Sequence, residues 1–252
     1  MTSGVTGGMT NLLGGLRARR AGREGLVSLH AVLDALGENG LMDRRHACVP
    51  LSAIVGTGAD ARVADFDGEF RLRNPALDDR WQRLACAMRS GTPVPPVRLI
   101  QVGEMYFVLD GHHRVSVSRA LGRPDIPAQV QRICTIAFAL ACLRAAHLQG
   151  KAAERRFLER VPLPTDVRAD LWLDEPSAWA RLADSAEAWG FRRSLDGRPI
   201  RDRGELAEAW WSEEVMPVVE GRRAAGDRPT GRDVAVYVES LAEQARGRAA
   251  VA

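Results

Sequence analysis

The chain of 252 residues contains almost no lysine. Lys151 is its only lysine, so nearly all of the 35 lysine and arginine residues are arginines. Such a composition, with abundant alanine, is typical of a GC-rich bacterial genome, and the arginines alone are therefore no evidence for phosphate contacts. The scarcity of lysine does exclude a P-loop, which needs a lysine after a glycine-rich run that is not present here.

Paired cysteines and long apolar runs are also missing. None of the four cysteines is spaced as C-x-x-C, which argues against a zinc knuckle or a redox pair and predicts free thiols. The longest apolar run, residues 134–143, is too short to cross a bilayer. The first residues contain no apolar segment of the signal-peptide type. We therefore expect a cytoplasmic protein without a membrane partner.

The overall charge excludes little. A net charge of +3 is too small to demand a nucleic-acid partner. Residues 1–25 are rich in small residues and then in arginine, so we expect a mobile basic tail. A tail of this kind could also contact DNA, and the candidate contacts are then Arg17, Arg19 and Arg20.

Residues 26–135 alternate between strand and helix patterns. The helix over 78–91 has the clearest periodicity, and Gly103-Glu104 suits a two-residue turn between two strands. The expected elements are a helix at 28–36, a strand and turn at 47–56, a loop at 57–70, a helix at 78–91, a hairpin at 97–109, a short helix after residue 111, and a strand at 125–133.

Residues 136–252 are predicted to form a helical C-terminal domain. Five of the six tryptophans lie there, which indicates packing by large aromatic side chains. The fold class is therefore α+β, with a small mixed sheet followed by helices. The helical signals cover residues 135–149, 151–160, 177–189, 203–221 with a break at Pro217, and 231–246 with Thr230 as its cap.

The most informative stretch is the turn Asp110-Gly111-His112-His113-Arg114, which joins a strand to a short helix. The start of a helix exposes unpaired N–H groups and a partial positive charge, so it is suited to bind an anion. Gly111 allows close approach of a ligand, and Arg114 offers a planar guanidinium for phosphate oxygens. The two histidines could donate hydrogen bonds or exchange a proton.

The acid in this turn requires its own explanation. Asp110 would repel a bare phosphate, but it would fit if it held Mg²⁺ or oriented a histidine. A plainer interpretation is that Asp-Gly is a common turn and that Asp110 caps the helix. A binding site is supported equally well, because the turn and its helix combine His112, His113, Arg114 and Ser116.

The segments "VPLSAIVG" and "RWQRLACAMRSGTPVPPVRLIQVGEMYFVLDGHHRVSVSRALGRPDIPAQV" resemble the N-terminal domain of ParB-like partition proteins and the related sulfiredoxins. The D-G-H-H-R turn also resembles that of ParB-like free-serine kinases. The C-terminal half is similar to actinobacterial ParB-like proteins of unknown role. The resemblance covers residues 48–133, about a third of the chain.

The resemblance implies a nucleotide site. It places Gly111, His112, His113 and Arg114 along the phosphates, and Asp110 where the kinases have a metal-binding or catalytic acid. His112 stands where sulfiredoxin has its catalytic cysteine, so reduction of the sulfiredoxin type is not expected. The histidine pair also replaces the Glu-Arg of the partition proteins, so their preference for CTP does not transfer.

A second acidic group precedes the turn. Asp65 and Asp67 in "ADFDGEF" could contribute to a metal site, with Asp67 as the candidate and Arg62 as a weaker neighbour. The alternative is a solvated acidic loop with Phe66 turned inward.

The sequence thus predicts a nucleotide-binding protein that uses ATP, ADP or CTP with Mg²⁺. It would hydrolyse the nucleotide or transfer a phosphoryl group, with Asp110 and His113 as catalytic residues and Gly111, His112, His113, Arg114 and Ser116 on the phosphates; Asp110 and Asp67 would bind metal. The alternative is a DNA-associating partition or regulatory protein in which the nucleotide is a switch. A homodimer is a candidate assembly, and the sequence indicates no residues for its interface.

Overall fold

The computed structural model describes residues 25–225 and 231–249. These residues divide into two compact units. The first contains residues 25–33 and 39–134, and the second contains residues 34–38 together with 135–225 and 231–249. We expect residues 34–38 in the first domain from the sequence, but they group with the helices of the second unit.

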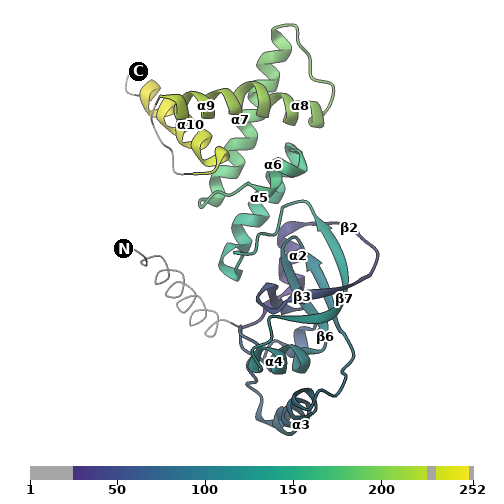
Figure 1. The fold of residues 1–252 in the computed structure, drawn as a ribbon. Helices are drawn as coiled ribbons and strands as arrows, with labels where there is room; N and C mark the ends of the chain where they lie inside the picture. The colour runs from purple at the N-terminus through teal and green to yellow at the C-terminus, as the bar shows by residue number, and fades with distance from the viewer. Residues whose placement is uncertain (1–24, 226–230, 250–252) are drawn as a thin grey trace, which may run out of the picture. The chain divides into compact units, whose positions relative to one another are not determined.

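The first unit is built on a mixed seven-stranded sheet (Figure 1). Its strands run in the order β1, β4, β6, β5, β7 and β2, and β3 also pairs with β7. Neighbouring strands are parallel in the pairs β1–β4, β4–β6 and β5–β7, and antiparallel in β5–β6 and β3–β7. The bounds are Val27–Ser28 (β1), Glu38–Leu41 (β2), Arg45–Pro50 (β3), Ile54–Thr57 (β4), Val97–Val102 (β5), Met105–Asp110 (β6) and Asp125–Thr135 (β7).

The hairpin β5–β6 carries the chain to the turn that the sequence singles out. Gly103 has a φ of 57°, the left-handed conformation that glycine adopts readily, and this confirms the predicted tight turn. Val97, Leu99 and Val108 of the hairpin are buried in one core with side chains of β3, β4, β7 and the loop before α3. The sheet therefore holds the end of β6 rigidly.

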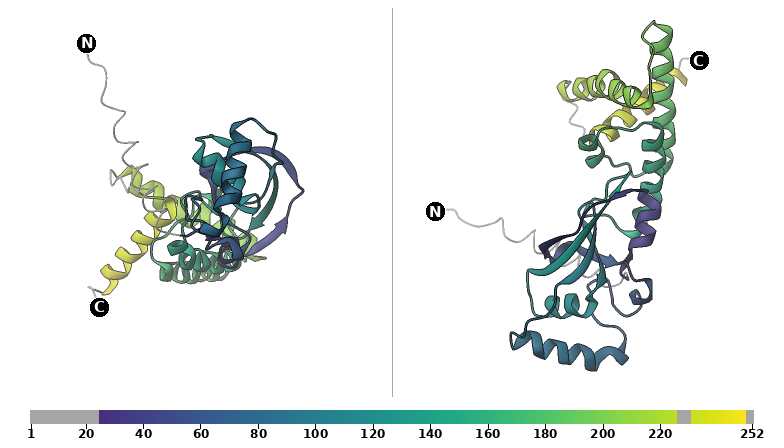
Figure 2. Two further views of the ribbon diagram at one scale, coloured as in Figure 1. Left: turned by 90° about the horizontal axis from the view of Figure 1, so that it is seen from below. Right: turned by 90° about the vertical axis from the view of Figure 1, so that its right-hand side faces the viewer.

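Helix α4 (His112–Ala120) lies between the sheet and helix α3 (Asp78–Arg89), as Figures 1 and 2 show. Val115 belongs to the core of the sheet, whereas Val117 packs with Ala85 and Met88 of α3. Because α4 is buried on two sides, the position of its first turn is fixed by packing. The third helix of this region, α2 (Leu29–Leu36), ends at Gly37 as predicted.

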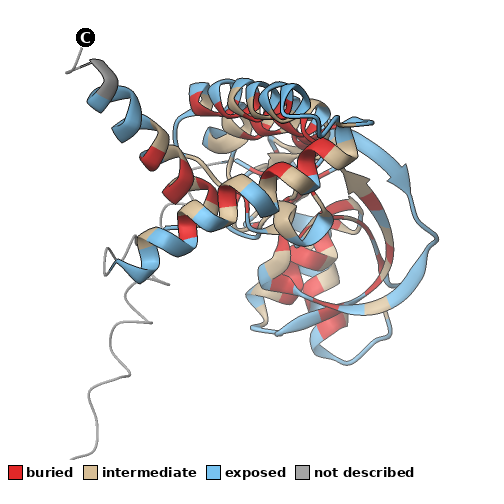
Figure 3. Cartoon of the chain, turned by 90° about the horizontal axis from the view of Figure 1, so that it is seen from above, coloured by how far each residue is buried: buried red, intermediate tan, exposed pale blue. Residues whose placement is uncertain are grey.

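The second unit consists mainly of helices. They are α5 (Leu148–Arg160), α6 (Thr165–Ala169), α7 (Pro176–Leu195), α8 (Arg203–Trp210), α9 (Met216–Ala224) and α10 (Asp233–Ala249). Buried and exposed stretches alternate along them, as amphipathic helices require (Figure 3). The predicted cap Thr230 lies outside the described residues.

The predicted helix over residues 135–149 is wrong. Strand β7 continues to Thr135, and the chain then runs irregularly to a short 3₁₀ turn at Ala145–His147. The backbone N–H groups of Ile136 and Ala137 donate to the carbonyls of Gly37 and Leu36. These tertiary hydrogen bonds replace the helical ones that the apolar composition suggested.

Large aromatic side chains form the centre of the helical unit, as predicted. Phe157 of α5 lies with its ring centroid 5.4 Å from that of Trp179 of α7 and 6.3 Å from that of Trp210 of α8. The Trp210 ring in turn contacts Tyr237 of α10 at 5.6 Å. Each aromatic pair contributes about 0.5–1.5 kcal/mol beyond the burial of its area.

Helices α8 and α9 are joined by one π-helical turn, Trp211–Val215. Pro217, the second residue of α9, has no N–H to donate to a preceding carbonyl. A wide turn accommodates this loss, so the predicted break at Pro217 is a local widening and not an end of helical structure.

Candidate functional site

The turn between β6 and α4 requires glycine at its centre. Gly111 has a φ of 102°. A Cβ atom at this position would lie 2.6 Å from Cγ1 of Val97 and 3.0 Å from Nε of Arg114. Both the backbone conformation and the lack of space therefore exclude a side chain.

The first turn of α4 presents free N–H groups. No side chain caps the helix at Gly111. The N–H groups of His112, His113 and Arg114 cannot be paired within the helix, because their carbonyl partners would precede it. Together with the helix dipole they make a local site for negative charge.

A hollow of about 440 Å³ lies beside this helix start. We call it the α4 hollow; its lining residues are Ala59, Arg62, Arg80, Leu84, Val94, Pro95, Leu109, Asp110, Gly111, His112, His113 and Arg114. Three guanidinium groups and one carboxylate line it, so its charge is positive on balance. The structure thus brings together five of the predicted residues, Asp110 to Arg114, around a space that a ligand can enter.

His112 is held by the protein. Its Nε2 lies 2.8 Å from Oγ1 of Thr57 in a hydrogen bond, and its ring stacks on Phe66 at a centroid distance of 5.9 Å. Burial, with a smaller contribution from the charge of Arg62, lowers the pKa of His112 to about 4. The imidazole is therefore neutral at pH 7.

His113 differs from His112 because neither of its ring nitrogens has a hydrogen-bond partner, although both are buried. The side chain is 8% exposed, and its ring meets Phe66 edge-on at 5.4 Å. Burial and the charges of Arg80 and Arg62 lower the pKa of His113. A buried imidazole without partners costs free energy, so a group that supplied them would be stabilised there.

Arg114 is engaged inside the protein. Its NH1 donates to the carbonyls of Pro95 and Pro96 at 2.6 and 2.8 Å, and its NH2 donates to Oδ2 of Asp110 at 2.7 Å. Its side chain is only 14% exposed. The guanidinium therefore holds the turn against the segment before β5. Arg114 also lines the α4 hollow.

Asp110 is the one carboxylate in the lining of the α4 hollow. Its side chain is 62% exposed, and Arg114 occupies only Oδ2. Over the described ranges, no three histidine, cysteine, aspartate or glutamate side chains are grouped so that they could hold a metal ion. Mg²⁺ commonly binds through one or two carboxylates plus phosphates and water, so Asp110 fits such a site only if a ligand supplies the remaining oxygens.

Two of the predicted residues lie away from the hollow. Ser116 is buried, and its Oγ accepts a hydrogen bond from Nε1 of Trp81 at 2.9 Å. Asp67 accepts hydrogen bonds from the backbone of Glu69 and Arg71 and from Nε of Arg71. Both side chains stabilise local structure, with Asp67 ordering the loop that buries Phe66.

Two arginines from the preceding segments face the hollow. Arg62 donates to Oδ2 of Asp65 at 2.9 Å, and Asp65 also accepts from Asn74. Hydrogen bonds from Asn74 and Arg62 lower the pKa of Asp65, so it remains ionised. Arg80 lies exposed in the first turn of α3. Sequence reasoning missed Arg80, because nothing local to α3 shows which helix its first turn faces.

The predicted DNA contacts Arg17, Arg19 and Arg20 lie outside the described residues, and DNA association stays a prediction. Within residues 25–225 and 231–249, no helix combines the length and the apolar character needed to cross a membrane. All four cysteines are free, as the sequence predicts.

No protein-family model matches the chain, and no curated protein matches it. Among solved structures, it is similar to sulfiredoxin from Arabidopsis thaliana, with 19% identity and a TM-score of 0.25 over 36% of this chain and 88% of that one. A Pnob8-like ParB-N domain has 13% identity and a TM-score of 0.25 over 72% and 54%. Truncated ParB from Caulobacter crescentus in complex with CTP-γ-S has 14% identity and a TM-score of 0.26 over 81% and 98%.

These structures are of the two kinds that the sequence resembles. The expected fold class, a mixed α+β sheet domain followed by helices, is confirmed by the architecture of the chain itself.

Proposed function

We propose that this chain binds a nucleotide through its phosphate groups in the α4 hollow. The observation that carries the proposal is the combination of free N–H groups at the start of α4 with arginines 62 and 80 beside an open space. Phosphate oxygens would accept hydrogen bonds from the helix start and from both guanidinium groups.

The histidines contribute in different ways. His112 is bonded to Thr57 and supports the turn. His113 lines the hollow, and its two ring nitrogens are buried without partners. A change of its side-chain rotamer would bring one of them to a phosphate oxygen or a nucleotide hydroxyl, which would satisfy it. The apolar side chains of Leu84, Val94 and Leu109 offer a surface for the sugar or the base.

Metal and catalysis are the further part of the proposal. A bound Mg²⁺ would be held by Asp110 and by phosphate oxygens, and it would neutralise negative charge on the nucleotide. His113 is the candidate proton acceptor because it is neutral and its nitrogens are free of partners. These features support hydrolysis or phosphoryl transfer, and they do not favour either reaction over the other.

The direct test is calorimetric titration of the full chain with ATP, ADP, CTP and tripolyphosphate, with and without Mg²⁺. Arg80→Ala is expected to weaken binding about tenfold, since a charge-assisted contact to phosphate contributes on the order of 1–3 kcal/mol. Arg83→Ala is the matched control, because Arg83 is also exposed on α3 but does not line the hollow.

The results separate the parts of the proposal. Absence of binding by all four compounds at millimolar concentration would refute phosphate binding. Binding that is unaffected by Arg80→Ala would refute the assignment to this hollow. Catalysis is tested by measuring phosphate release from nucleotide in the wild type and in His113→Gln. If the wild type turns over nucleotide and the variant does so at the same rate, His113 is not the proton acceptor.

A further inference from the structure

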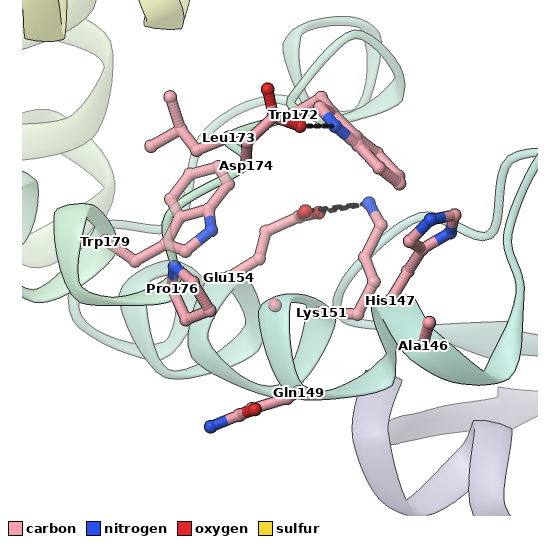
Figure 4. A pocket seen from close by; sticks show the side chains of 11 residues that line it. Ala146, His147, Gln149, Lys151, Glu154, Trp172, Leu173, Asp174, Pro176 and Trp179 are labelled. Carbon is pink, nitrogen blue, oxygen red and sulfur yellow. Dashed lines mark hydrogen bonds and ion pairs between the residues drawn. The ribbon is translucent and has the colours of Figure 1, made fainter.

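The only lysine of the chain lines a second hollow, which lies within the helical unit and is independent of the proposed nucleotide site. We call it the Lys151 hollow (Figure 4). Its volume is about 130 Å³, and its lining is Ala146, His147, Gln149, Gly150, Lys151, Glu154, Trp172, Leu173, Asp174, Pro176 and Trp179. A space of this size admits a small organic molecule and not a nucleotide.

Lys151 forms a buried pair with Glu154, one turn further along α5. The Nζ atom lies 2.9 Å from Oε1 and 2.7 Å from Oε2, and the two side chains are 2% and 1% exposed. A buried ion pair is weak evidence for stability, because desolvation of both charges offsets their attraction. Its presence beside a hollow therefore suggests a role beyond folding.

Aromatic side chains form the walls around this amine. Nζ lies 5.5 Å from the centroid of the Trp172 ring, and the His147 ring meets the same indole edge-on at 5.1 Å. Nε1 of Trp172 donates to Oδ1 of Asp174, and Nδ1 of His147 accepts from the backbone of Arg144. Both rings are thus oriented by their own hydrogen bonds, which leaves their faces and edges as rigid apolar walls.

The identity of the residue is informative in this chain. Every other lysine-or-arginine position in the sequence is arginine, and the single lysine is buried. A lysine amine can lose its proton and act as a nucleophile, whereas a guanidinium in a protein cannot. Position 151 therefore has the side chain required for amine chemistry.

The neighbouring carboxyl can take the proton. Burial raises the pKa of Glu154 to about 7, against the opposing effects of the charges of Lys151 and Arg232 and of the backbone N–H of Phe138. A group of this kind accepts and returns protons near neutral pH. Free anions would be repelled by Glu154 and free cations by Lys151, so a neutral electrophile fits the pair best.

We propose that Lys151 forms an imine with a small aldehyde or ketone that enters this hollow. Glu154 takes a proton from the ammonium, and the free amine adds to the carbonyl carbon as the carbonyl oxygen gains a proton. Loss of water then leaves a protonated imine, so one ammonium and one carbonyl give one iminium and one water. No oxidant or further reactant is needed.

The test is reductive trapping of the full chain at pH 7 with propanal or benzaldehyde and cyanoborohydride, followed by peptide mass mapping. The mapping is simple because Lys151 is the only lysine. The reference for an ordinary lysine is Arg156→Lys on a Lys151→Arg background, since position 156 is exposed on the same helix. We expect Lys151 in the wild-type chain to be alkylated at least about ten times faster than this surface lysine, because Glu154 is placed to take its proton inside the hollow.

Two outcomes overturn the proposal. One is an alkylation rate at Lys151 equal to or below that of the surface reference. The other is labelling of Lys151 only after unfolding in urea. Glu154→Gln is expected to slow trapping while the melting curve remains cooperative, and unchanged trapping in this folded variant would remove Glu154 from the proposed step.

Discussion

Two adjacent histidines in α4 show how burial determines chemistry at single residues. Both have lowered pKa values, yet His112 is hydrogen-bonded to Thr57 while His113 has no partner. The sequence predicted that both would face phosphate. It could not show that one ring would face the sheet, because that depends on the rotation of α4 between two packed layers.

The pKa of His112 predicts a dependence of stability on pH. The folded protein holds this imidazole neutral down to about pH 4, whereas in the unfolded chain it takes up a proton near pH 6.5. The unfolded state therefore binds more protons between these values, and the free energy of unfolding falls as the pH is lowered from 6.5 to 4. The contribution of His112 to this loss is at most about 3 kcal/mol.

Urea denaturation at several pH values between 4.5 and 7 measures this effect. His112→Gln should flatten the pH dependence by removing the titrating group, and it is compared with His46→Gln at an exposed position of β3. Identical pH slopes for the wild type and His112→Gln would contradict the assigned burial of a neutral imidazole. The comparison concerns slopes, so a uniform loss of stability in either variant does not affect it.

At the scale of elements, the junction of β6 and α4 depends on one backbone conformation. Gly111→Ala would put a methyl group against Val97 and Arg114 at a positive φ. We expect a loss of about 1–3 kcal/mol in the free energy of unfolding, with weaker nucleotide binding because the Arg114 guanidinium is displaced.

Gly221→Ala in helix α9 is the matched control for this substitution. A Cβ atom at residue 221 would meet nothing within 4 Å, and alanine is the better helix former. The free energy of unfolding of this variant should rise by up to about 1 kcal/mol. Thermal and urea denaturation measure the stability of both variants. A Gly111→Ala protein as stable as the wild type would show that the turn tolerates a side chain.

Several elements of the first unit could be predicted from local sequence signals alone. The helix α3, the hairpin and the turn into α4 follow from periodicity, glycine positions and prolines that lie close together in the sequence. The segment after β7 could not be predicted in this way. Its apolar residues are helix-compatible, and hydrogen bonds to residues 36 and 37, a hundred positions away, determine its course.

The same distinction applies to the candidate site. The turn from Asp110 to Arg114 is contiguous, so its residues were found from the sequence, and the structure brings them together at one hollow. Arg80 comes from an element more than twenty residues earlier, and only the packing of α3 on α4 brings it to that hollow. The inward positions of Ser116 and Asp67 likewise depend on tertiary partners, Trp81 and the loop backbone.

At the scale of the molecule, each of the two units has a hollow of its own, and no residue lines both. We therefore expect the two proposed ligands to bind without coupling. Reductive alkylation of Lys151 should change the affinity for nucleotide less than twofold, because sites without shared partners are energetically independent.

Calorimetric titration of the alkylated and untreated protein checks this expectation, and hydrogen exchange gives a second measure. Nucleotide should protect amides near the start of α4 and in α3, and it should leave those of α5 unchanged. A tenfold change in affinity after alkylation would instead reveal communication between the units, and protection spreading to α5 would indicate the same.

The widened turn at Trp211–Val215 has a consequence for comparing this chain with others. One π turn corresponds to the insertion of a single residue into an α-helix. Relatives of this chain that have no proline at position 217 do not need the inserted residue. Their alignment with this chain should then open a one-position gap between the two helical stretches, with Trp210 and Val219 as fixed landmarks on either side of it.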